Sequence, residues 1–335
     1  MGLNGCMIGA GFFARHHIDA WRRIKGVQIV AVADHDGERA KAFAREFGIE
    51  RWYTDAETML DEIDCSFVDI VTRPAAHGAL VRLAAERQKA IWCQKPFART
   101  LTEAAELVEL CERRGVRLMV NENWRWQPWY RAMQRALGAG QVGQVHHVQC
   151  VVRPGDGSGP NPYPAQPYFR TMKQFLIRET LIHFLDTFLF LCGPVHRVNC
   201  RTRRLNPAIE GEDFALITLQ FQSGASGVID ANRYAGARSS ETFCQMRVEG
   251  SKGSLELGLN GELYWIDMRG ERRLLSYLRP KEGYRGDSCR STHLHFIEGL
   301  LDEKPFETEG AAYLMTLQLV EACYKSADLG APVVI

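Results

Sequence analysis

Short apolar runs, rich in β-branched residues, alternate with more polar segments over the first third of the chain. They cover residues 3–8, 27–33, 67–72, 89–93 and 116–121. Runs that are apolar throughout are typical of strands buried on both faces of a parallel sheet. We therefore predict parallel strands at these positions.

The segments between the runs have the composition of helices. They include residues 38–47, 76–88 and 101–113. The last of these begins beside Thr100 and Thr102, either of which can cap a helix, and ends before Gly115, a common helix stop. Alternating strands and helices predict a doubly wound α/β domain, which we place at residues 1–123.

The pattern changes after about residue 142. Apolar and polar residues alternate one by one, and short turns join the segments, which lie at 212–222, 226–233, 243–249 and 254–258. Period-two alternation predicts an antiparallel sheet with two unlike faces. We expect an α+β domain at residues 124–335 with a large, mostly antiparallel sheet. One face should pack on helices, and the other is available to a second subunit.

Composition and charge narrow the possible functions. The chain has 335 residues, and its 41 Lys and Arg nearly balance its 40 Asp and Glu. This balance gives no reason to expect nucleic acid or an anionic membrane as a partner. The longest apolar stretch, at 181–192, is interrupted by His183 and Asp186 and is too short to span a bilayer.

The ten cysteines indicate a reducing environment. They are scattered, form no Cys-x-x-Cys pair, and several lie in apolar runs, where buried free thiols are common. The first residues show no basic segment of the kind that opens a secretory signal. These features together predict a cytoplasmic protein.

A glycine motif follows the first predicted strand and opens a helix. Gly9, Gly11 and Ala14 are spaced as G-x-G-x-x-A, with Phe12 and Phe13 between them. In such a motif the first glycine permits a tight turn and the second lets the backbone approach a pyrophosphate. The helix N-terminus offers N–H groups to the phosphates. The motif therefore predicts a dinucleotide-binding Rossmann domain.

The end of the second predicted strand favours NAD over NADP. The strand ends at Asp34, whose carboxylate can accept hydrogen bonds from the adenosine ribose hydroxyls and would repel a 2′-phosphate. Neither His35 nor Asp36, which follow, is an arginine that could hold that phosphate.

A polar stripe runs along the apolar helix predicted at 178–193. Glu179, His183 and Asp186 fall on one face at helical spacing. On a buried face such groups are costly unless they are paired or functional, but an ordinary water-facing stripe or a satisfied core histidine explains them equally well. A Glu and a His four residues apart can also bind a metal ion, but the sequence lacks an obvious third and fourth ligand. We expect no metal.

A long connector and a strand end carry further candidates. Residues 153–169 contain five prolines and three glycines, as lids, binding loops and oligomer contact arms do. Tyr163 in this loop could stack on a sugar face.

The run at 89–93 ends at Gln94, Lys95 and Pro96. Because the carboxyl ends of strands in an open α/β sheet face the ligand crevice, Lys95 is expected at the cofactor.

These motifs resemble the Gfo/Idh/MocA family of oxidoreductases over essentially the whole chain. The resemblance rests on GAGFFA at 9–14, VADHD at 32–36, VTRPAAH at 71–77, CQKPFART at 93–100, NENWRWQP at 121–128 and ETLIHFLD at 179–186. It implies oxidation or reduction of a sugar or cyclitol carbon with NAD(P), and dimers or tetramers formed through the C-terminal sheet. The sequence at 94–98 and 121–131 most resembles the branch of the family that oxidises D-apiose.

The resemblance also implies residue roles. The expected catalytic residues are Lys95, Glu179 and His183. The expected cofactor residues are Gly9, Gly11, Phe12, Phe13, Asp34, Thr72, Pro74, His77, Gln94, Lys95 and Arg125. The expected substrate residues are Lys95, Asn123, Trp126, Tyr163, Glu179 and His183. In two places the chain departs from the family pattern, because Gln94 stands where Glu is usual and Glu179 where Asp is usual.

The chemistry of these groups suits an alcohol dehydrogenation. Imidazole, as in His183, can accept a hydroxyl proton near neutral pH, and Lys95 can stabilise the charge that develops on the oxygen. We expect an NAD-dependent dehydrogenase that oxidises an aldose at C1 to the lactone. The alternatives are a cyclitol or polyol dehydrogenase acting on a secondary alcohol, and a non-catalytic NAD(H)-binding sensor, which would need neither Lys95 nor His183.

Overall fold

The computed structural model describes residues 2–235 and 241–335, and the chain separates into two compact units. The first unit comprises residues 1–126 and 280–317, and the second comprises 127–279 and 318–335. This division differs from the ranges 1–123 and 124–335 expected from sequence, because the segment 280–317 returns to the first unit. Hydrophobic periodicity shows where an element lies, but not on which core it packs.

The first unit is built on a six-stranded parallel sheet with the order β3-β2-β1-β4-β5-β6. Its strands are β1 (Leu3–Ile8), β2 (Val27–Ala33), β3 (Arg51–Tyr53), β4 (Phe67–Ile70), β5 (Ala90–Gln94) and β6 (Leu118–Asn121). Its connecting helices are α1 (Ala14–Arg22), α2 (Gly37–Phe47), α3 (Ala56–Glu62), α4 (Pro74–Glu86) and α5 (Leu101–Arg114). This strand order is that of a dinucleotide-binding Rossmann fold, so the predicted fold of this part is confirmed.

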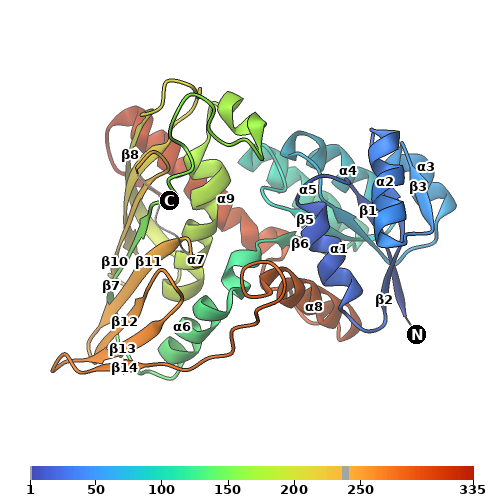
Figure 1. Ribbon diagram of the computed structural model, residues 1–335. Helices are drawn as coiled ribbons and strands as arrows, with labels where there is room; N and C mark the ends of the chain where they lie inside the picture. The colour runs from blue at the N-terminus through green and yellow to red at the C-terminus, as the bar shows by residue number, and fades with distance from the viewer. Residues whose placement is uncertain (1, 236–240) are drawn as a thin grey trace. The chain divides into compact units, whose positions relative to one another are not determined.

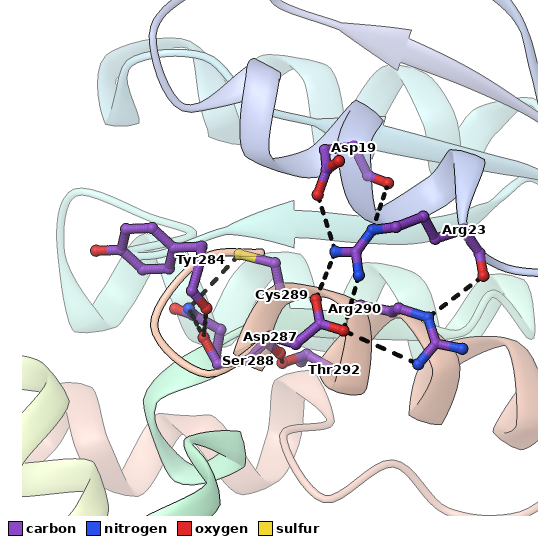
Figure 2. Close-up of polar contacts among 9 residues, drawn as sticks. Asp19, Arg23, Tyr284, Asp287, Ser288, Cys289, Arg290 and Thr292 are labelled. Carbon is purple, nitrogen blue, oxygen red and sulfur yellow. Dashed lines mark hydrogen bonds and ion pairs between the residues drawn. The ribbon is translucent and has the colours of Figure 1, made fainter. Parts of the chain in front are cut away.

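Residues after 280 complete the first unit. A short helix, η1 (Asn123–Trp126), packs against α8 (Ser288–Leu301), which also packs on α1. Figure 2 shows how Arg23, which directly follows α1, lies between Asp19 and Asp287, the residue directly before α8. The Arg23 Nη1 atom donates to Asp287 Oδ2 at 2.8 Å. This ion pair joins segments 264 residues apart in the chain.

The second unit is built on a nine-stranded sheet with the order β14-β13-β12-β11-β7-β10-β9-β8-β15. Its strands are β7 (Val145–Val152), β8 (Val195–Arg203), β9 (Phe214–Phe221), β10 (Ser226–Asn232), β11 (Cys244–Gly250), β12 (Gly253–Leu257), β13 (Leu263–Asp267), β14 (Arg272–Leu274) and β15 (Val333–Val334). Within the described part of this sheet, β7 and β10 pair in parallel and all other neighbours are antiparallel, so the predicted mostly antiparallel sheet is confirmed.

Helices cover one face of this sheet. Figure 1 shows α6 (Pro128–Gly138) and α7 (Ile182–Cys192) along it. The alternation of buried and exposed residues along β7 and β9 follows from this cover. A long helix, α9 (Gly310–Leu329), belongs to the first unit up to Leu317 and to the second unit beyond it.

The helix expected at 178–193 is not a uniform α-helix. It opens with a π-helical turn, η3 (Leu176–Leu181), and continues as α7. A π turn holds an extra residue, so Glu179 and His183 lie in segments of different helical period. Among the described residues no helix is both long and apolar enough to cross a membrane. The ten cysteines are all free thiols.

Candidate active site

The glycine motif forms the turn between β1 and α1. Gly9 has φ +106°, and a Cβ atom there would lie 2.3 Å from the Val71 carbonyl oxygen, so only glycine fits. A Cβ on Gly11 would meet no atom within 4 Å, which leaves space beside the backbone for a ligand. At the start of α1, Phe13 makes no side-chain cap, and the first turn holds no acidic residue. This turn therefore fits a pyrophosphate on the helix N-terminus.

Asp34 lies at the end of β2 and is bound to the glycine turn. Its Oδ2 atom accepts the Ala10 N–H at 2.9 Å, and its Oδ1 atom accepts the Asp36 N–H at 3.0 Å. An arginine that the sequence argument did not consider, Arg39 in α2, places its Nη1 atom 3.4 Å from Asp34 Oδ1. Its Nη2 atom donates to Asp36 Oδ2 at 2.8 Å, so two carboxylates face its charge.

The other predicted residues of the glycine turn differ in exposure. Phe12 is exposed, with 58% of its surface accessible, whereas Phe13 is half-buried. The Phe13 ring makes edge contacts with His17 and Tyr284, at centroid distances of 5.5 Å and 5.3 Å. Phe13 therefore packs the start of α1 against the segment that precedes α8.

His77 ties together the ends of β4 and β5. It lies fully buried in α4, with Nδ1 2.8 Å from the Pro96 carbonyl oxygen and Nε2 3.0 Å from the Thr72 carbonyl oxygen. Burial lowers the pKa of His77, although both carbonyl groups oppose this effect. The half-buried Pro74 begins α4 one turn earlier. His77 thus holds the backbone beside Lys95.

Gln94 faces the core through a buried polar network. Its Oε1 atom accepts the Lys95 backbone N–H at 2.6 Å, and its Nε2 atom lies 3.4 Å from His17 Nε2. The Asn121 amide lies 2.7 Å from the same His17 nitrogen. On its other side, His17 Nδ1 contacts both carboxylate oxygens of Asp69, at 2.9 and 3.0 Å. We infer that His17 donates to Asp69 through Nδ1 and accepts the amides through Nε2.

A buried carboxyl group lies on the strand next to Lys95. Gln94 and Asn121 pair in register at the ends of β5 and β6, so Lys95 and Glu122 follow at the same edge of the sheet. Lys95 is half-buried, whereas Glu122 is fully buried. From the sequence, Glu122 is only one letter of a motif. It lies in a polar stretch, and nothing there indicates that its side chain is buried.

The remaining candidates of the first unit make internal contacts. Asn123 is 2% exposed, and its amide donates to Ser288 Oγ at 2.8 Å. Arg125 donates to the Glu307 carbonyl oxygen at 3.1 Å. Trp126 is buried in the core cluster of this unit. These contacts show how the residues support η1, and their predicted ligand roles stay predictions.

The second unit carries the other catalytic candidates. Glu179 is half-buried in η3, and His183 is 7% exposed in the first turn of α7. Asp186, one turn on, is fully buried. His183 and Asp186 therefore lie away from bulk water, which argues against a stripe that faces water along its whole length. The structure thus divides the candidate residues, because Lys95 belongs to the first unit and Glu179 and His183 to the second.

Tyr163 lies inside a cluster built around Arg233. The Tyr163 ring is 3% exposed and packs edge-on against Phe169 and Phe175. The Arg233 guanidinium stacks over this ring at 4.7 Å and donates to Thr180 Oγ1 at 2.9 Å. The cluster fixes the proline-rich loop, so the Tyr163 ring serves packing, and its contact with a sugar stays a prediction.

Comparison with known proteins shows to which protein family the chain belongs. Residues 3–122 match the oxidoreductase family with an NAD-binding Rossmann fold, and residues 130–256 match the GFO/IDH/MocA C-terminal domain. A D-apiose dehydrogenase of Paraburkholderia graminis is 40% identical, over 98% of this chain and 88% of its own. The chain belongs to the GFO/IDH/MocA oxidoreductase family. The predicted family, oxidoreductase class and NAD cofactor are thereby confirmed.

Two further relatives agree with this assignment. A D-apiose dehydrogenase of Rhizobium rhizogenes is 36% identical, over 98% of this chain and 96% of its own. An oxidoreductase of Agrobacterium radiobacter, solved in complex with NAD+, L-tartaric acid and magnesium, is 34% identical. It superposes with a TM-score of 0.92 and covers 100% of this chain and 98% of its own. Gly9, Gly11 and Asp34 lie within the range that matches the NAD-binding model, and their roles toward NAD stay predictions.

Proposed function

We propose that this protein is an NAD-dependent sugar dehydrogenase that oxidises D-apiose at C1 to the lactone. The observation that carries the proposal is the similarity to two D-apiose dehydrogenases over 98% of the chain. Lys95 at the carboxyl end of β5 supports it, because ligands of open α/β sheets bind at that edge.

Each candidate side chain has a defined task in this reaction. The chemistry that NAD supplies when bound is hydride acceptance. His183 takes the proton of the substrate hydroxyl on an imidazole nitrogen, and Lys95 donates a hydrogen bond to the same oxygen as its charge develops. Glu179 orients His183 or binds a neighbouring hydroxyl. Asp34 and the glycine turn hold the dinucleotide.

The test is the appearance of NADH absorbance with a panel of aldoses, inositols and other polyols. We expect turnover with D-apiose, and loss of at least about a hundredfold in kcat for Lys95→Ala and His183→Ala. Fastest turnover with an inositol would support the cyclitol alternative. Tight NAD binding without turnover of any compound would support the sensor. Full activity of both variants would show that the catalytic assignment is wrong.

We further propose that the protein is cytoplasmic and forms a homodimer or homotetramer through the uncovered face of the nine-stranded sheet. Its ten free thiols support a reducing compartment. Val151 and Leu216 are both 37% exposed on strands that alternate buried and exposed residues. Size-exclusion chromatography with light scattering tests the assembly. Leu216→Asp should shift a multimer toward monomer, and a monomeric parent protein would refute the proposal.

A further inference from the structure

A carboxyl group without a task in the proposed chemistry lies beside Lys95. β5 and β6 are parallel neighbours, and Gln94 pairs with Asn121 at their last residues. Lys95 and Glu122 follow directly, so they leave the sheet on adjacent strands, which are about 4.8 Å apart. The register therefore places an acid and a base next to each other at the ligand-binding edge.

The surroundings of Glu122 favour a carboxyl group whose charge can change. Its Oε2 atom accepts the Tyr313 hydroxyl at 2.9 Å, and Oε1 lies 3.4 Å from the Trp124 N–H. Burial raises the pKa of Glu122 to about 7, whereas Lys95, the Tyr313 hydroxyl and Arg125 act in the opposite direction. Glu122 is therefore part ionised near neutral pH, and Lys95 is one of the groups that favour its ionised form.

The residue next to Lys95 in the chain does not supply a charge. Gln94 is neutral, its Oε1 accepts the Lys95 backbone N–H, and its Nε2 lies near His17. Its side chain is therefore engaged with the backbone and the core. The register brings Glu122 to the same edge from the neighbouring strand, and Lys95 is a charge that favours its ionised form.

We propose that Glu122 is a positioning residue for Lys95, whose carboxylate holds the Lys95 ammonium in place for turnover. This inference rests on the proposed function, because it takes Lys95 as the residue that stabilises the reacting oxygen. It assigns a role to a residue outside the expected catalytic set of Lys95, Glu179 and His183. It predicts that the ionisation of Glu122 depends on the presence of Lys95.

Unfolding measured between pH 5.5 and 9 tests this dependence without turnover. A buried carboxyl with a raised pKa stabilises the fold while protonated, so the parent protein should lose stability as the pH rises through about 7. Glu122→Gln should remove this loss. Lys95→Met should move it about one pH unit upward, since a cation that favours the ionised form is gone. A loss that stays in place in Lys95→Met would overturn the proposal.

Activity with D-apiose and NAD separates the proposed role of Glu122 from the proposed function of the protein. At pH 8 we expect Glu122→Gln to lower kcat about tenfold while the KM for NAD changes less than about threefold. Tyr313→Phe removes a hydrogen bond but no negative charge, so its effect should be smaller, and it should also move the pH-dependent loss upward. This variant keeps the test decisive if Glu122→Gln does not fold. Folded Glu122→Gln with parental kcat beside inactive Lys95→Met would refute only the role of Glu122. Fully active Lys95→Met would refute the catalytic role of Lys95 on which this inference rests, whereas a parent protein that does not turn over D-apiose would refute the proposed function.

Discussion

Asp34 acts on the glycine turn, in addition to the contact with the ribose that we propose for it. One carboxylate oxygen accepts the Ala10 N–H, and the other accepts the Asp36 N–H. Hydrogen bonds to an ionised acceptor are stronger than those between neutral groups. The carboxylate therefore ties β2 to the phosphate-binding turn, and a change at this position affects more than the choice of cofactor.

Removing this tie should weaken both folding and NAD binding. We expect Asp34→Ala to lower the free energy of unfolding by about 1–3 kcal/mol, because backbone donors lose their acceptor, and to raise the KM for NAD at least about tenfold. Asp36→Ala is the matched control, since Asp36 caps α2 through the Arg39 N–H. It should cost about 1 kcal/mol with little change in KM. Denaturant titrations and initial rates check both, and unchanged stability of Asp34→Ala would contradict the tie.

His77 makes the fold sensitive to acid. Burial lowers its pKa below the ordinary value of 6.5. The neutral ring therefore contributes stability that is present above about pH 6.5 and is lost as the pH falls toward its folded pKa. His77→Gln should reduce the loss of the unfolding midpoint between pH 7 and pH 5. His293, which is buried with its pKa lowered for the same reason, keeps part of the acid effect. If the unfolding midpoint of His77→Gln falls between pH 7 and pH 5 as much as that of the parent protein, groups other than His77 cause the fall.

The positions of some of these residues could be predicted from the sequence, but the side chains that surround them could not. The turn at Gly9 and Gly11 and the place of Asp34 after β2 were predictable, because a short motif fixes their spacing. Glu122 was not, since its burial depends on Tyr313, which comes almost two hundred residues later in the chain. For the same reason, the packing of Tyr163 around Arg233 could not be predicted from the loop alone.

Elements with clear ends were the most predictable. β1 and β2 begin and end where the apolar runs do, because each lies between strong turn signals. β3, at Arg51–Tyr53, is too short for its pattern to show. The helix expected at 178–193 was wrong in its first turn, since hydrophobic spacing does not distinguish a π turn from an α turn within so few residues.

The start of α5 allows the contribution of one such signal, the N-terminal helix cap, to be measured. Either Thr100 or Thr102 could have capped this helix, and the structure selects Thr100, whose Oγ1 accepts the Glu103 N–H at 3.1 Å. Thr100→Ala should lower the free energy of unfolding by about 1 kcal/mol, because the donor loses its partner. Thr102→Ala, at an exposed position in the same turn, is the control and should change stability by less than about 0.5 kcal/mol. Equal effects in denaturant titrations would refute the cap.

The path of the chain as a whole is the feature that local patterns predicted least. Residues 280–317 come after the large sheet and yet belong to the same compact unit as the glycine turn. Their attachment depends on contacts between distant segments, such as Arg23 with Asp287 and Arg117 with the Gly299 carbonyl oxygen. No spacing rule within a short window contains this information, so only residues 1–123 of the unit were predicted from the sequence.

The pair of Arg23 and Asp287 tests how firmly this segment is held. Asp287 directly precedes α8 at φ 64°, a conformation that asparagine also adopts, so Asp287→Asn removes the charge with little backbone strain. We expect Arg23→Met and Asp287→Asn each to cost about 1–3 kcal/mol, and the double variant to cost less than their sum by about 1 kcal/mol or more. Asp19→Asn alters the other, exposed partner of Arg23 and should cost no more than about 0.5 kcal/mol. Strict additivity in denaturant titrations would mean that apolar packing of α8, rather than this ion pair, joins the two parts of the unit.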